Sequence, residues 1–203
     1  AAREMARAAA EQVLQGQART EPSTLGAEHR EPDRVESAPI PTLVAGVVIL
    51  HPYIKLLFKR LDVLNEQGRI ADGALDRAYS ILSYLTLHGG PPDPMHYILL
   101  GLEGRPRLTA QSLEDSARTM INGLLEAIIS QWGKLGKTSP DGLRETFLRR
   151  DGFLTIEPNS GTRLSVAPGP FDMLLDALPW SLSPVGLPWM IAPCHVDWRS
   201  KDG

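Results

Sequence analysis

Two short stretches of the 203-residue chain have side chains that could do chemistry. Residues 136–138, Gly-Lys-Thr, match the end of a phosphate-binding loop, but Gln131 stands where that loop needs its first glycine, and a helical pattern precedes them. Cys194, His195 and Asp197 are residue types that bind metals, but alternation along a strand would turn Cys194 away from the other two. We therefore expect a helix end with a loop lysine, a buried thiol and a surface histidine, and no catalytic, cofactor-binding or metal-binding residue.

One cluster of basic residues offers a candidate surface for protein binding. Arg144, Arg149 and Arg150 follow Lys134 and Lys137 in a region of helical spacing. They could form an ordinary solvated helix face, or they could dock an acidic partner protein. Because the formal net charge is −3, nucleic acid is the weaker choice of partner.

Two tryptophans near the C-terminus are the other candidates for an interface. Trp180 and Trp189 each follow a Leu-Pro pair, in a stretch (residues 170–190) that sets bulky apolar residues beside prolines. Tryptophan normally belongs to a core, but it is also enriched among the residues that dominate binding interfaces. The candidate interface residues are Arg144, Arg149, Arg150, Trp180 and Trp189.

The composition predicts a globular domain with a terminal appendage. Hydrophobic residues make up 42% of the chain and charged residues 22%, which is typical of globular proteins. The single cysteine, Cys194, excludes an internal disulfide, and no apolar run approaches the roughly 20 residues that a membrane-spanning helix needs. Residues 1–36 join a helical stretch with a thin apolar stripe (Ala1–Gln15) to a polar, proline-containing linker. We expect the globular domain to cover residues 37–203.

Apolar spacing predicts that helices dominate this domain. The run Leu43–Leu50 is apolar on every side, which predicts that all of it is buried. Asp72, Ser112 and Ser139 are the residues expected to cap helix N-termini. The predicted helices are residues 51–61, 75–85, 95–102, 113–132 and 140–148.

Near the C-terminus the apolar period changes to two. Residues 153–157 and 162–166 flank Pro-Asn-Ser-Gly, which is typical of a β-hairpin, and residues 194–198 alternate like one more short strand. The predicted fold class is therefore α+β: a helix-dominated domain with a small C-terminal antiparallel β-sheet, formed by the hairpin and one short strand.

Three blocks of the chain resemble the tape measure protein family of contractile injection systems. They are residues 138–152, residues 170–190 with the repeated Leu-Pro-Trp, and, more weakly, residues 36–53. The resemblance covers roughly residues 36–198, and it departs from the family around residues 95–104 and at Gly186, where relatives are expected to have lysine.

The resemblance implies a structural protein without enzymatic activity or cofactor. Such a protein sets the length of the particle's tube, associates with the baseplate hub and has tube, hub or spike and baseplate proteins as partners. It assembles in the cytoplasm and then becomes part of the particle. Nucleic acid and a membrane span are not expected.

The length of the chain limits what it could measure. A fully helical chain of 203 residues would reach only roughly 300 Å. We therefore expect the globular, terminal part of a tape measure protein, with residues 1–36 as the end of the extended ruler or as a tether. The thin stripe of Ala1–Gln15 predicts pairing with copies of itself or with another protein. The alternative is a stand-alone adaptor or chaperone-like module that binds cargo or particle components.

Overall fold

The sheet of the computed structural model has four strands in the order β1-β2-β3-β4. The structure describes residues 38–87, 89–157 and 161–198. The helix and linker predicted for residues 1–36 lie outside these ranges, and the domain boundary near residue 37 stays a prediction. The strands are β1 (Ile40–Thr42), β2 (Gly152–Glu157), β3 (Gly161–Val166) and β4 (Cys194–Asp197).

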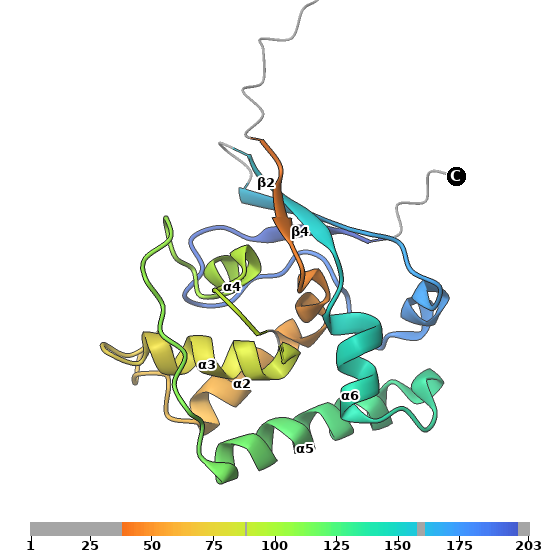
Figure 1. Cartoon of the computed structure of the whole chain (residues 1–203), viewed down its shortest axis with the longest axis horizontal. Helices are drawn as coiled ribbons and strands as arrows, with labels where there is room; N and C mark the ends of the chain where they lie inside the picture. The colour runs from red at the N-terminus through yellow and green to blue at the C-terminus, as the bar shows by residue number, and fades with distance from the viewer. Residues whose placement is uncertain (1–37, 88, 158–160, 199–203) are drawn as a thin grey trace, which may run out of the picture. The chain divides into compact units, whose positions relative to one another are not determined.

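Helical elements cover one side of this sheet (Figure 1). The α-helices of the described residues are α2 (His51–Arg60), α3 (Leu75–Thr86), α4 (Pro94–Leu99), α5 (Asp115–Gln131) and α6 (Pro140–Leu143). Short 3-10 turns are η1 (Ala45–Leu50), η2 (Gly133–Leu135) and η4 (Asp172–Ala177), and η3 (Arg144–Leu148) is a π-helical turn that continues α6. The predicted α+β class is confirmed.

The pairing of the strands differs in two respects from the prediction. The hairpin β2–β3 and the last strand are present, but β4 pairs parallel to β3, so the sheet is mixed. The long segment between β3 and β4 returns the chain to the same end of the sheet, as a parallel pair requires. In addition, β1 pairs antiparallel with β2, and this edge strand, which contains Pro41, was not predicted.

The start of each helix tests the predicted caps. Ser139 caps α6, and its hydroxyl accepts the N–H of Gly142 at 3.1 Å, as predicted. The prediction for Ser112 was wrong, because α5 begins at Asp115 and Glu114 occupies the N-cap without a side-chain hydrogen bond. Asp72 is likewise not a cap, since α3 begins at Leu75 after a turn.

The turn η1 lies at the centre of the core, between the sheet and the helices (Figure 1). All residues of Ala45–Leu50 are buried, but Leu43 is 54% exposed, so the predicted burial of the whole apolar run was wrong at its first residue. Thr42, at the end of β1, is buried instead, because alternation along the strand turns its neighbour outward. Gly46 lets η1 approach η3, since a Cβ there would lie 1.6 Å from the carbonyl oxygen of Phe147.

Candidate functional site in the C-terminal segment

The segment between β3 and β4, residues 167–193, is called the C-terminal segment below. Two of its tryptophans fasten it to the core. The indole N–H of Trp180 donates to the carbonyl of Ile49 at 2.9 Å, and that of Trp189 donates to the carbonyl of Leu99 at 2.8 Å. The Trp189 ring is only 9% exposed and stacks on Phe58, with ring centroids 5.3 Å apart. The segment is therefore held by directed hydrogen bonds as well as by apolar burial.

The other two tryptophans also contact this region. Trp132, at the end of α5, donates its indole N–H to the carbonyl of Leu174 at 2.9 Å. Trp198, just after β4, donates to the Asp172 carboxylate at 3.2 Å. Each of the four indole N–H groups therefore has an acceptor, and each of these bonds has one partner in residues 167–193.

Arg150 joins the first turn of the C-terminal segment to the core. Its guanidinium lies 3.3 Å from the carboxylate of Asp172 and donates to the carbonyl of Ala167 at 2.6 Å. The two charged side chains are 11% and 7% exposed, so this ion pair is largely removed from water. Asp172 also accepts the backbone N–H of Gly169 at 2.8 Å. A side chain at Gly169 would collide with the guanidinium, because a Cβ there would lie 2.0 Å from it.

Arg144 is an interior cation that connects three elements. Its guanidinium donates to the carbonyl of Leu85 at 3.0 Å, to the side chain of Asn122 at 2.8 Å and to Asp141 at 2.8 Å. The Leu85 carbonyl is one of those that α3 leaves without a helical partner, and a cation is favourable at a helix C-terminus. The Arg144 side chain is 4% exposed, so neither a solvated face nor an open docking surface describes it in this conformation.

The structure does not bring the predicted basic cluster together. Arg144 and Arg150 are turned inward, whereas Arg149 lies on the surface, 42% exposed and 3.0 Å from Glu145. Lys134 and Lys137 are exposed on and after η2. Of the predicted interface residues, Arg149 and the half-buried Trp180 are the ones that present surface; an interface role for any of the five stays a prediction.

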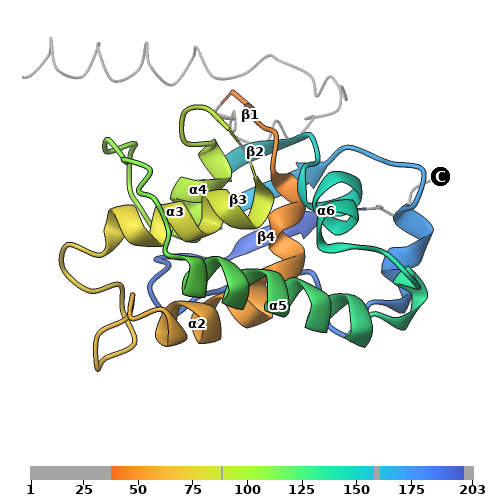
Figure 2. The same cartoon turned by 60° about the horizontal axis from the view of Figure 1, so that its bottom comes forward.

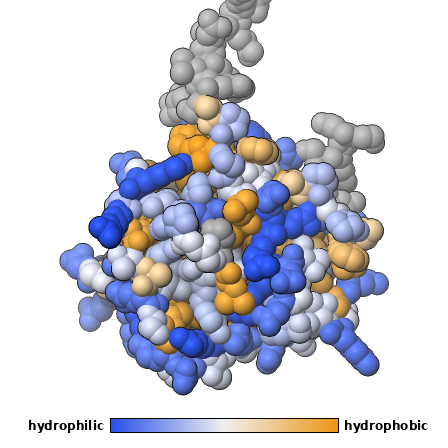
Figure 3. All heavy atoms as spheres, in the orientation of Figure 1, coloured by the Kyte–Doolittle hydropathy of each residue, from blue (hydrophilic) through white to orange (hydrophobic). Residues whose placement is uncertain are grey.

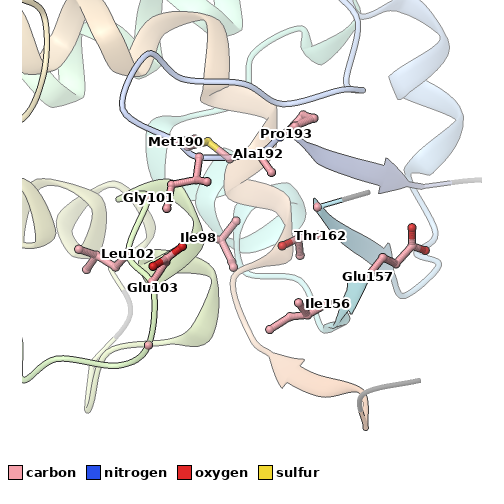
Figure 4. A pocket seen from close by; sticks show the side chains of 13 residues that line it. Ile98, Gly101, Leu102, Glu103, Ile156, Glu157, Thr162, Met190, Ala192 and Pro193 are labelled. Atoms are coloured by element: carbon pink, nitrogen blue, oxygen red, sulfur yellow. The ribbon is translucent and has the colours of Figure 1, made fainter. Parts of the chain in front are cut away.

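A groove opens where the C-terminal segment meets α4 and the end of the sheet (Figure 4). We call this cavity of about 750 Å³ the sheet-end groove. Its walls include Ile98 of α4, Ile156 of β2 and Met190 of the C-terminal segment. Glu103 and Glu157 also line it and add negative charge. Ile156 is 47% and the adjoining Ile191 71% exposed. Such walls can receive apolar side chains of a partner.

Gly101, in the wall of the sheet-end groove, lets the chain after α4 approach the C-terminal segment closely. This glycine has φ +67° and would place a Cβ 2.4 Å from the carbonyl oxygen of Trp189. The sequence reasoning missed the sheet-end groove, because its apolar residues come one or two at a time from distant elements. The face shown in Figure 3 is no guide either, because small groups of apolar residues alternate there with polar ones.

The stretches that seemed capable of chemistry have structural surroundings. Cys194 is buried, and desolvation raises the pKa of its thiol to about 12. His195 and Asp197 are partly exposed and alternate with it along β4. Thr138 donates its hydroxyl to the carbonyl of Leu135 at 2.6 Å, which closes the turn after η2. Among the described residues no three side chains suited to bind a metal come together.

Comparison with known families decides the identification. The family model of the contractile injection system tape measure protein matches residues 2–198. The chain belongs to this family. Neither a curated protein nor a solved structure gives a significant match. In the described part of the chain, no helix has the length and apolar character to cross a membrane.

The three blocks that resemble the tape measure family meet in the structure. Arg150 of block 138–152 pairs with Asp172 of block 170–190, and its carbonyl accepts the N–H of Ala45 in block 36–53 at 2.9 Å. Trp180 of block 170–190 donates to Ile49 of block 36–53. Gly186, where lysine was expected, is exposed and has open space around it, so a lysine there would fit. The family match also includes residues 2–35, which the three blocks do not cover.

Proposed function

We propose that the described domain anchors a tape measure protein to the baseplate hub of a contractile injection particle, without enzymatic activity. The observation that carries the proposal is the family match over residues 2–198. The C-terminal segment supports it physically, because tryptophan anchors and a buried ion pair make it a rigid base for the exposed Ile191. The sheet-end groove gives a hub or baseplate protein an apolar surface to bind.

In this proposal the length of the tube is set by an extended region and the domain holds one end of it. Residues 1–36 are then the end of the ruler or a tether. Oligomerisation through Ala1–Gln15 belongs to the same proposal. Light scattering of the full chain and of a chain lacking residues 1–36 tests it: equal monomeric masses would exclude self-association through this segment.

Deletion of residues 37–198 in the producing cells tests the anchoring role. We expect particles to be lost, or tubes to have an uncontrolled length in electron micrographs. A tagged chain should also co-purify with hub or baseplate proteins. Particles of normal number and tube length after the deletion would overturn the proposal. Normal particles that lack only a cargo protein would identify the chain as an adaptor instead.

A further inference from the structure

A second groove lies between α2 and α5, on the side of the domain away from the sheet. The two helices lie next to each other in Figure 2, and a cavity of about 300 Å³ runs between them. We call it the helix groove. Leu56 and Leu57 of α2 form one wall, and Met120 and Leu124 of α5 form the other. It shares no lining residue with the sheet-end groove.

The helix groove exists because two residues of α5 are too small to fill it. Gly123 and Ala127 are four apart and therefore lie on one face of the helix, and both line the cavity. A Cβ added at Gly123 would meet no atom within 4 Å. A glycine in the middle of a helix is less favourable than alanine, so this gap lowers the stability of α5.

Apolar side chains on both walls remain in contact with water. Leu56 is 46% exposed and Met120 is 36% exposed. One end of the helix groove is closed by the Tyr53 hydroxyl, which donates to the side chain of Gln131, and the other end is lined by Arg60. The result is an elongated apolar trough between two helices, which is the shape that receives one face of a third helix.

The charge beside the helix groove is positive. Arg60 of α2 lines the groove and Lys59 next to it is exposed, on a helix without any acidic residue. In the described part of the chain neither of these two cations forms an ion pair. Glu126, the acidic residue in the middle of α5, does not line the groove. A complementary partner therefore carries negative charge next to its apolar stripe.

We propose that the helix groove binds an acidic amphipathic helix of another protein. Apolar residues spaced three and four apart enter between Leu56 and Met120, over Gly123 and Ala127. Carboxylates beside that stripe pair with Arg60, which lines the groove, and with the neighbouring Lys59. This inference concerns a surface remote from the sheet-end groove and does not depend on attachment to the hub.

The test uses the full chain and a designed, fluorescently labelled helical peptide with leucines at i, i+4 and i+7 and glutamates along both sides of them. A second peptide with lysines in place of the glutamates is the control for charge. We expect anisotropy titrations to show binding of the acidic peptide at roughly micromolar Kd and at least roughly tenfold weaker binding of the basic one. Affinity should fall as the salt concentration rises.

Two variants address the walls of the helix groove. Gly123→Leu fills the trough, and the double variant Lys59→Glu, Arg60→Glu reverses its charge. Each should weaken the acidic peptide by roughly tenfold or more. Gly133→Leu and the double variant Lys134→Glu, Lys137→Glu make the same changes at exposed positions outside the groove and should leave the Kd unchanged. Far-UV circular dichroism of every variant should match that of the unaltered chain.

Three outcomes would overturn the inference. The first is that neither peptide binds, and the second is that both bind equally. The third is that the chain alone forms dimers that Gly123→Leu abolishes, which would make the helix groove a contact between copies.

Discussion

Arg144 shows how one charged residue can act as a structural connector. Its guanidinium makes hydrogen bonds to Leu85 in α3 and to Asn122 in α5, and it lies 5.4 Å from the centre of the Tyr84 ring. These partners are 59 and 22 residues away along the chain. No local pattern of charge could therefore reveal that this arginine, unlike Arg149, lies in the interior.

Substitution of the two arginines should separate these roles. Arg144→Met leaves a carbonyl and an amide without their donor, and we expect the free energy of unfolding to fall by about 2–4 kcal/mol. Arg149→Met removes an exposed pair with Glu145 and should cost less than about 1 kcal/mol. Urea denaturation measures both. Equal losses in the two variants would contradict the interior role of Arg144.

Cys194 should be unreactive as long as the protein is folded. Burial raises the pKa of its thiol to about 12, so almost no thiolate is present at pH 8. We expect a disulfide reagent to label one thiol per chain in denaturant and almost none without it.

The Cys194 thiol should also make stability depend on pH. Because the folded state holds the thiol proton more tightly than the unfolded state, the contribution of the thiol to stability is complete below about pH 9 and is lost as the pH rises towards 12. Cys194→Ala should remove that alkaline component from the pH dependence of unfolding, and rapid labelling of the folded chain would contradict the burial.

At the scale of elements, local sequence patterns predicted the helices and the hairpin that residues close together in the chain determine. The periodicity of residues 113–132 identified α5, and Ser139-Pro140 marked the start of α6. The hairpin β2–β3 was visible from its alternation and turn residues. By contrast, β1 is held by its pairing with β2 and by Asp93, which accepts the N–H of Leu43 at 2.8 Å, and both are distant in sequence. No local pattern therefore predicted this strand.

The candidate sites follow the same division. Trp180 and Trp189 were noticeable by residue type, but their partners Ile49 and Leu99 were not. Both grooves combine residues from elements far apart in the chain, so the sequence contained no pattern for either. Gly123 is the exception, because a glycine inside an amphipathic helical pattern is a recognisable local signal of a close approach or an open space.

The close approach of η1 and η3 gives a prediction for an element contact. Gly46→Ala would place a methyl group 1.6 Å from the Phe147 carbonyl oxygen, so the two turns must separate. We expect a loss of about 1–3 kcal/mol or more, because backbone cannot move aside as a side chain can. Gly133→Ala, where the added Cβ meets nothing, should change stability by less than about 1 kcal/mol. Thermal melts compare the two variants, and a stable Gly46→Ala protein would show that η1 and η3 are not tightly packed.

At the scale of the whole domain, the three blocks that resemble the tape measure family hold the fold together. The three blocks meet through Arg150, Asp172, Ala45, Trp180 and Ile49, and most of these contacts are buried or partly buried. The three blocks therefore form one common core, and we expect partners to bind residues outside that core. Both grooves fit this division, because their exposed walls at Leu56, Met120, Ile156 and Ile191 contribute little to packing.

The C-terminal segment should unfold together with the helices, and Trp189 provides the test. Trp189→Ala removes the stack on Phe58 and the bond to Leu99, and we expect it to lower stability by about 3–5 kcal/mol. Far-UV circular dichroism follows mainly α2, α3 and α5, whereas fluorescence follows tryptophans that all contact the C-terminal segment. In a cooperative domain both midpoints shift to the same lower urea concentration. Ile191→Ala, at a neighbouring residue that is 71% exposed, should shift neither. If Trp189→Ala shifted only the fluorescence midpoint, the C-terminal segment would be a separately unfolding plug, and its tryptophans would be free to act as docking residues after all.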